Sequence, residues 1–410
     1  MTQRLVCALG VVTFVALAWA VSSYRSKMPW RVVLGGLGLQ FALAVLVLKT
    51  TVGLKVLQAL TAGVERALDC TTVGTTFVFE SFDPSDEFTL LKTFAFSALP
   101  TIIFFSSLMS VLYYVGVMQK LVAGLAWVMR RTLGTSGVET LAASANVFVG
   151  MTEAPLVIKP YLRDMTRSEL MAMMVGGFAT VTGGLLGAYA SFGVEIEHLL
   201  TACIISAPAA LVIAKVMLPE TEEVAVKGRV EMVSEEVNVI GAAVTGASDG
   251  MRLAINVAAM LIAFLALIAL GDLLLLQITY GIEWLIGRDI VDLSIGLILS
   301  YAFWPLAFLL GIPPSECFES ARLIGLKTVA NEFLAYAELG PNEELSERTR
   351  TVLTYALAGF SNLGAIGIQV GGIGALEPSR KTDLARFGLR AMFGGLLACL
   401  MTGAVVGVLL

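Results

Sequence analysis

The sequence predicts an all-α membrane protein with eight transmembrane helices plus two re-entrant helical hairpins, arranged as an inverted repeat of hairpin, broken helix and helix. Composition is the first indication, because 57% of the 410 residues are hydrophobic and only 14% are charged, whereas soluble domains carry about 25% charged residues. The second is that apolar residues gather in segments of about 20, the length of a membrane-spanning helix. The third is that interrupted apolar segments occur in the same order in both halves of the chain.

Eight apolar segments are long and continuous enough to be spans: 5–23, 32–48, 93–118, 169–192, 197–218, 251–275, 347–372 and 385–410. The first of them resembles a signal peptide, but its basic residues follow the apolar run instead of preceding it. We therefore expect a span that is retained. Residues 52–68 are amphipathic, with charges only at the polar edges, and are predicted to form an interfacial helix.

Two further apolar regions do not fit a single crossing. Residues 136–163 contain Glu153 and Pro155 in the middle, and residues 292–337 are too long for one span and are interrupted at 311–316. Irregular backbone is tolerated at membrane depth only where it is buried in protein or lines a wet cavity. Both regions are therefore predicted to be re-entrant hairpins, each with two short helices that meet at a tip inside the membrane.

The order of hairpin, broken span and span occurs twice, over residues 136–218 and 292–410. Between the two lie a polar linker, predicted over 219–250, and one intact span. An odd number of crossings between two similar halves inverts one relative to the other, which is typical of secondary transporters.

The basic residues of the short loops indicate how the chain is oriented. Lys and Arg are enriched in cytoplasmic loops, and four basic loops lie on the same side if both termini face outward. We therefore predict that both termini are on the outer side of the membrane. The basic residues are Arg25, Lys27, Arg31, Lys120, Arg130, Arg131, Arg163, Arg167, Arg380, Lys381, Arg386 and Arg390.

Cysteine and histidine usage excludes several kinds of site. The five cysteines are scattered and odd in number, so they indicate neither a disulfide framework nor a metal site. A single histidine, His198, cannot supply a histidine-rich zinc centre, and we expect it at the membrane interface.

Two glutamates lie inside apolar stretches, one in each predicted hairpin: Glu153 and Glu332. A charge at that depth is costly and indicates a functional site. For Glu153 the alternative is a helix start in which Thr152 is the N-cap. For Glu332 it is an ion pair with Lys327, but residues five apart do not share a helix face. A carboxylate in this setting suits the hydroxyl or amine donors of a polar, uncharged solute.

Glycine-rich breaks in the spans after each hairpin are a further indication of a binding site. Unwound carbonyls, together with Asn or Thr side chains, make oxygen sites suited to Na⁺, and Asn146 and Thr180 are placed to converge in this way. The alternative is that the glycines serve close helix packing, which is common in membranes.

Three motifs closely resemble those of the concentrative nucleoside transporter family, bacterial type, and the resemblance runs over essentially the whole chain. They are Asn146-Val-Phe-Val-Gly150-Met151-Thr152-Glu153-Ala-Pro155, Lys327-Thr-Val-Ala-Asn331-Glu332-Phe333 and Gly359-Phe360-Ser-Asn362. The resemblance implies uptake of nucleosides driven by sodium or protons, a homotrimer in the bacterial inner (plasma) membrane, and termini in the periplasm. It also implies four regions. They are scaffold and interfacial helices in 1–135, a first transport-domain repeat in 136–218, a cytoplasmic linker and scaffold helix in 219–291, and a second transport-domain repeat in 292–410.

The resemblance also implies roles for individual residues. The nucleobase would be recognised by Thr152 and Glu153 within the motif that holds Gly150 and Met151, with Leu185 beside the base and Phe360 near it. Glu332 and Asn362 would hold the ribose hydroxyls. The sodium site would comprise the Asn146 and Thr180 side chains with the carbonyls of Val149 and Val181, and this polar pair favours Na⁺ over a proton as the coupling ion.

Two positions depart from the family pattern. Met151 stands where the family usually has glutamine, and Ala365 where it usually has serine. Each change removes a hydrogen-bonding group, and an unmet polar contact costs about 1–3 kcal/mol. The hypothesis is that this pocket prefers an altered base or a deoxyribose.

The sequence therefore predicts a sodium-coupled symporter that imports nucleosides across the inner membrane. The expected partners are the solute, the lipid bilayer and further copies of the chain, with no nucleic acid. Alternatives are a symporter of the same fold for a modified nucleoside or another solute, and coupling to protons. An intramembrane enzyme that uses both carboxylates is not favoured, because the sequence has no nucleophile constellation or metal motif. A passive channel is the remaining alternative.

Overall fold

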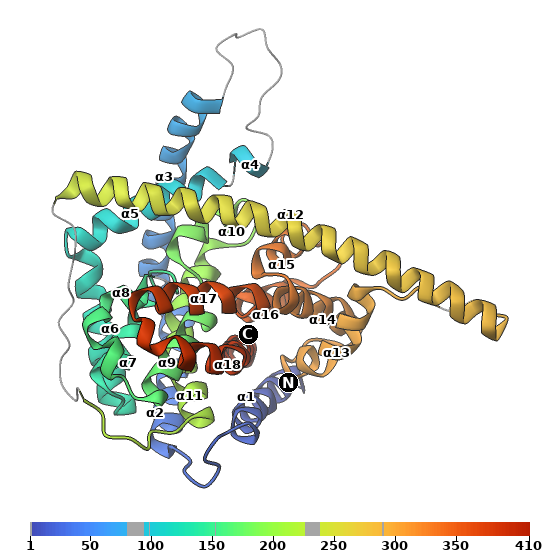
Figure 1. Cartoon of the computed structure of the whole chain (residues 1–410), viewed down its shortest axis with the longest axis horizontal. Coiled ribbons are helices and arrows are strands. Elements are labelled where there is room, and N and C mark those ends of the chain that lie inside the picture. The colour runs from blue at the N-terminus through green and yellow to red at the C-terminus, as the bar shows by residue number, and fades with distance from the viewer. Residues whose placement is uncertain (1, 80–93, 98, 152, 226–237, 289–290) are drawn as a thin grey trace.

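A computed structural model describes residues 2–79, 94–97, 99–151, 153–225, 238–288 and 291–410 (Figure 1). Within these ranges every regular element is a helix, so the predicted all-α class is confirmed. Six of the described helices are long and apolar enough to cross a membrane, and two bent helix pairs can each form one further span.

The first part of the chain consists of five long helices and the short helix α4 among the described residues. They are α1 (Thr2–Ala20), α2 (Trp30–Lys49), α3 (Thr51–Phe79), α4 (Phe94–Ser97), α5 (Leu99–Tyr114) and α6 (Val117–Leu133). The interfacial helix predicted over 52–68 is the first part of α3, which continues to Phe79. The axes of α5 and α6 differ by 75°, and the bend lies at Gly116, whose φ of 87° favours glycine.

The first repeat follows in the predicted order of hairpin, broken helix and helix. Its elements are α7 (Gly137–Ala145), α8 (Ala154–Val157), η2 (Lys159–Asp164), α9 (Arg167–Ala179), η3 (Gly183–Leu185), α10 (Leu186–Ala190) and α11 (Ile196–Met217). Both α7 and α9 begin with a capping box, formed by Ser136 with Glu139 and by Thr166 with Glu169. Each box satisfies backbone N–H groups at a buried helix start.

One buried lysine joins three segments of this repeat. The Lys215 ammonium, near the end of α11, lies 2.6 Å from a carboxylate oxygen of Glu139 and 3.3 Å from Glu220, and donates to Ser168 Oγ at 2.8 Å. Removing one partner of such a buried pair leaves an uncompensated charge and destabilises a protein strongly. The starts of α7 and α9 are therefore held to the end of α11.

The long helix α12 (Val239–Ile286) corrects the predicted linker over 219–250, because residues 239–250 are helical. The polar, glutamate-rich part of the predicted linker ends before α12, and the first turns of the helix carry small residues that pack against α5. A Cβ at Gly246 would lie 2.6 Å from Ser106 O, and one at Gly250 would lie 2.7 Å from Ile103 Cα. The last part of the predicted polar linker is therefore a helix in close contact with α5. In Figure 1, α12 extends across the full width of the molecule.

The second repeat has one more break than predicted. Its elements are α13 (Ile295–Leu309), α14 (Pro314–Val329), α15 (Glu332–Leu339), α16 (Glu347–Leu357), α17 (Leu363–Leu376), η4 (Pro378–Arg380) and α18 (Lys381–Leu409). The predicted break at 311–316 exists, but it turns α13 by 116° into α14. The tip of the hairpin lies at Ala330 and Asn331, where Asn331 caps α15 by accepting a hydrogen bond from Leu334 N at 2.9 Å.

The centre of the fold is formed by α9, α11 and α18, most of whose residues are buried, whereas α12 is largely exposed. The two ends of the chain lie close together, because Arg4 Nη2 donates a hydrogen bond to the Leu410 carbonyl at 2.6 Å. Residues of both hairpin tips, both broken helices and α12 face a common space.

Candidate functional site

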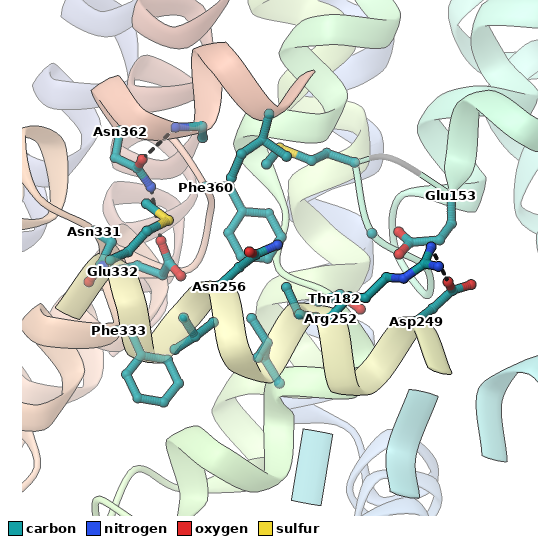
Figure 2. Close-up of a pocket in the computed structure, with 18 of the residues that line it drawn as sticks. Glu153, Thr182, Asp249, Arg252, Asn256, Asn331, Glu332, Phe333, Phe360 and Asn362 are labelled. Atoms are coloured by element: carbon teal, nitrogen blue, oxygen red, sulfur yellow. Dashed lines mark hydrogen bonds and ion pairs between the residues drawn. The ribbon is translucent and has the colours of Figure 1, made fainter. Parts of the chain in front are cut away.

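A cavity of about 350 Å³ lies where the hairpin tips, the broken helices and α12 meet (Figure 2). Eight residues that the sequence singled out line it: Gly150, Met151, Glu153, Leu185, Glu332, Phe360, Asn362 and Ala365. Thr152 is outside the residues that the structure describes. The predicted ion ligands Asn146, Val149, Thr180 and Val181 are not among the lining residues and lie behind the first hairpin tip.

Glu332 occupies the first turn of α15 and is only 4% exposed. Its Oε1 accepts a hydrogen bond from the Tyr189 hydroxyl at 3.1 Å, and its Oε2 accepts one from Asn362 Nδ2 at 3.2 Å. Asn362 Oδ1 in turn accepts from Ala365 N at 2.8 Å, which caps α17. Two helix N-termini, that of the hairpin helix α15 and that of the half-helix α17, therefore stabilise negative charge at this end of the cavity.

The predicted alternative of an ion pair between Glu332 and Lys327 is not what the structure shows. Lys327 Nζ instead donates a hydrogen bond to the Ala356 carbonyl at 3.0 Å. Glu332 is thus oriented by neutral donors, and these leave carboxylate lone pairs available for a solute.

Glu153 lies at the opposite end of the cavity, with Phe360 between the two glutamates in Figure 2. It is the residue before α8 and makes no side-chain capping bond. The Thr152 cap of the alternative lies outside the described residues. Its carboxylate folds back over Gly150, where an added Cβ would lie 2.2 Å from Glu153 Oε2. Only glycine leaves room for the carboxylate in this position.

Sequence reasoning missed the contribution of α12 and one threonine. Asp249, Arg252 and Asn256 of α12 line the cavity, as does Thr182. Figure 2 shows Arg252 reaching toward Glu153 from α12, and its guanidinium also lies 3.9 Å from Asp249. The available signal was the spacing of Arg252 and Asn256, four residues apart on one face of an apolar helix.

Thr182 mirrors Asn362. Its side chain accepts a hydrogen bond from Gly184 N at 3.2 Å and so caps the second half of the first broken helix, as Asn362 caps α17 in the second repeat. In both repeats a polar cap of the second half-helix therefore faces the cavity.

The predicted ion ligands lie where α7 and α9 end. Asn146 follows α7 and is 1% exposed, and both polar atoms of its amide lack a hydrogen-bond partner among the described residues. Thr180 follows α9 and donates through Oγ1 to Gly176 O at 2.9 Å. The amide is close to the same turn, since a Cβ at Gly176 would lie 3.1 Å from Asn146 Nδ2.

This arrangement fits a monovalent cation. A buried polar group without a hydrogen bond is costly and calls for a partner. Carbonyls at the C-terminal ends of half-helices are the oxygens that coordinate Na⁺ in transporters of broken-helix architecture. The Asn146 amide oxygen and the Thr180 hydroxyl are donors of the kind that such an ion prefers.

Family signatures cover most of the chain. The signature described as "Na+ dependent nucleoside transporter C-terminus" matches residues 198–407, its N-terminal counterpart matches 9–82, and a "Nucleoside recognition" signature matches 95–195. The chain belongs to the Na⁺-dependent, concentrative nucleoside transporter family. The predicted family is therefore confirmed, and since the family and its relatives are transporters, so is the prediction that the chain is not an enzyme.

Relatives of this family match the whole chain. Human solute carrier family 28 member 3 is 41% identical over 99% of this chain and 60% of its own length. Rat sodium/nucleoside cotransporter 2 is 39% identical over 99% of this chain and 63% of its own length. The chain thus spans about 60% of the length of the curated relatives it matches.

Solved structures are equally similar over the whole chain. CNTnw in an inward-facing substrate-bound state is 39% identical, with a TM-score of 0.89 over 99% of this chain and 97% of that one. A CNTnw variant in an outward-facing state gives a TM-score of 0.90 at 39% identity, again over 99% and 97%. The predicted fold of spans and re-entrant hairpins is therefore confirmed.

Proposed function

We propose that this chain is a symporter that couples sodium entry to nucleoside import. The observation that carries the proposal is the pair of glutamates, Glu153 and Glu332, at opposite ends of one cavity between hairpin tips and broken helices. A cavity of about 350 Å³ is within the usual range of small-molecule sites. Glu332 is buried and Glu153 is half-buried, and carboxylates in such apolar surroundings are retained where they serve a ligand.

The two ends of the cavity suit the two parts of a nucleoside. Glu332 and Asn362, oriented by Tyr189 and by the start of α17, are placed to hold ribose hydroxyls. Glu153, with Thr152, would accept donors of the base. Leu185 and Phe360 supply the apolar walls between them. This division places hydrogen-bond acceptors where a nucleoside has donors.

Asn146 and Thr180, with the carbonyls of Val149 and Val181, would hold the coupling ion, which supplies a positive charge to the C-terminal ends of α7 and α9. With its amide so engaged, Asn146 fixes the first hairpin tip in the position in which Glu153 faces the solute. Coupling requires that the ion prefer the solute-competent conformation over the alternative.

The assembly and its orientation are further parts of the proposal. The exposed apolar side of α12 supports a homotrimer in which α12 and residues 1–135 form the scaffold. The repeats 136–218 and 292–410 would form the transport domain, with the region 219–291 between them. The contact between Arg4 and Leu410 supports placement of both termini on one side of a bacterial inner membrane, and the basic loops assign that side to the periplasm.

The test is uptake of labelled nucleosides into proteoliposomes with and without an inward sodium gradient. We expect accumulation above the external concentration, which collapses when the sodium gradient is dissipated. Uptake that only equilibrates would indicate a channel. Accumulation driven by a proton gradient in sodium-free buffer would show that the coupling ion is a proton. Failure of every nucleoside to compete would show that the solute is not a nucleoside.

Two buried positions predict an altered preference within this site. Met151 and Ala365 both line the cavity, so neither offers a hydrogen bond where the family usually has Gln and Ser. We expect the double variant Met151→Gln, Ala365→Ser to bind uridine about tenfold or more tightly, since each restored bond is worth about 1 kcal/mol. Competition by a panel of ribo- and deoxynucleosides measures the change. Met151→Leu is the size-matched control, and equal uridine affinity in the parent and the double variant would refute the altered pocket.

A further inference from the structure

A second buried cation is not used by the proposed mechanism. Lys327, in the last turns of α14, is fully buried. Among the described residues its ammonium donates one hydrogen bond, to the Ala356 carbonyl at 3.0 Å, and has no carboxylate within ion-pair distance. An ammonium has three donors, and a buried charge is costly unless it is fully compensated. The Glu332 carboxylate, which lies beyond ion-pair distance, compensates part of this charge. The retention of Lys327 therefore calls for a function.

The partner of Lys327 is the negative end of a half-helix. Ala356 belongs to the last turn of α16, which ends at Leu357, and the chain then runs unwound until α17 begins at Leu363. The last carbonyls of a helix lack intrahelical partners and carry the equivalent of about half a negative charge. The ammonium of Lys327 thus compensates the C-terminal end of α16 in the middle of the fold.

The same place in the first repeat has no basic side chain. There α7 takes the position of α14 as the first hairpin helix, and α9 takes the position of α16 as the first half of the broken helix. Asn146 lies against Gly176 in the last turn of α9, and its amide has no hydrogen-bond partner among the described residues. One repeat therefore presents polar ligands to the half-helix end, while the other presents a lysine.

We infer that the Lys327 ammonium is a tethered cation that occupies, in the second repeat, the place for which the first repeat recruits a sodium ion. This inference rests on the proposed sodium site at Asn146 and Thr180. It means that the chain binds one mobile cation instead of two at its paired half-helix ends. It also means that truncating Lys327 creates a site for a small monovalent cation or a primary alkylammonium ion.

The position of Lys327 also ties this charge to the solute. The hairpin tip at Ala330 and Asn331 follows α14 directly, and Glu332 follows the tip. Loss of the ammonium removes the contact that fixes the end of α14 to α16, and so loosens the tip that carries Glu332. The effect of losing the Lys327 ammonium can therefore be measured in two ways, by nucleoside affinity and by thermal stability.

The test compares Lys327→Ala with Lys327→Met in the purified full-length protein. Melting temperatures are measured in choline chloride and then with added sodium or n-propylammonium chloride. We expect both variants to melt several degrees below the parent in choline. The alanine variant should recover at least half of that loss with sodium or propylammonium, because truncation leaves room for the cation. Recovery is counted beyond the rise that the same salt gives the parent, and the methionine variant, which fills the same space, should show none.

The outcomes separate this inference from the proposed function. A methionine variant as stable as the parent, or an alanine variant that neither cation rescues, would show that Lys327 only fills space and would overturn the inference. If the alanine variant cannot be purified, the methionine variant alone decides, through its melting temperature and a loss of about tenfold or more in nucleoside affinity. Absence of any sodium-dependent stabilisation in the parent would instead count against the first-repeat sodium site.

Discussion

Replacement of Glu332 by glutamine is expected to lower nucleoside affinity about 100-fold. The carboxylate accepts hydrogen bonds from Tyr189 and Asn362, whereas the amide nitrogen of a glutamine would face one of these donors with another donor. Bonds from ribose hydroxyls to a charged acceptor are worth about 1.5–3 kcal/mol each. Two weakened bonds give the expected factor, which equilibrium binding of a labelled nucleoside measures.

Glu338→Gln is the matched control for this prediction. Glu338 lies on the same helix, α15, but it is outside the cavity and pairs with Arg322 at 2.5 Å. We expect its nucleoside affinity to stay within about threefold of the parent, because partly exposed ion pairs contribute little. Equal affinities of the Glu332→Gln and Glu338→Gln variants would remove Glu332 from the solute site.

Replacement of Asn146 by alanine is expected to abolish the response to sodium. The amide has no hydrogen-bond partner among the described residues, so its loss breaks no bond on which the fold depends. We expect the variant to melt close to the parent in choline, and to lose both the rise in melting temperature with sodium and the stimulation of uptake. Stabilisation by a ligand follows its concentration relative to its dissociation constant, so titration with sodium measures the effect directly.

The thermodynamic linkage between sodium binding and nucleoside binding provides a second test of the Asn146→Ala variant. If sodium raises nucleoside affinity, the nucleoside raises sodium affinity by the same factor, and Asn146→Ala should lose both effects together. The control is Asn342→Ala, which removes an amide that caps a loop by accepting from Glu344 N and Leu345 N, far from α7 in the sequence. A sodium titration of Asn146→Ala that overlays the parent would exclude Asn146 as an ion ligand.

Much of the fold was predictable because bilayer-length apolar segments and paired interruptions are local features of the chain. The first hairpin was placed correctly since Glu153 and Pro155 interrupt an otherwise apolar stretch. The tip of the second hairpin was misplaced, because Gly311 and Pro313 are stronger breakers than Ala330 and Asn331, where the chain actually reverses. At that tip a side-chain cap replaces the usual glycine or proline, and its strength depends on tertiary surroundings that the sequence does not show.

The residues that the two repeats contribute to the cavity were predictable, but those that α12 contributes were not. Motif residues of both hairpins converge in the structure, as expected of an inverted repeat. The face of α12 that lines the cavity was missed, because Asp249 looked like the end of a linker and Arg252 like the edge of a span. Contacts between α12 and the hairpins join residues about a hundred positions apart, and nothing local in the chain encodes them.

The cluster around Lys215 has a mechanical consequence. The Lys215 ammonium contacts Glu139, Ser168 and Glu220 at once. Moving the base of the first hairpin away from α9 or α11 would therefore leave a buried charge without its partner. A rigid displacement of the base of the first hairpin relative to α12 would therefore move the starts of α7 and α9 and the end of α11 together. We expect such a displacement to turn about a point outside these segments, at Gly134, whose left-handed φ of 72° separates α6 from α7.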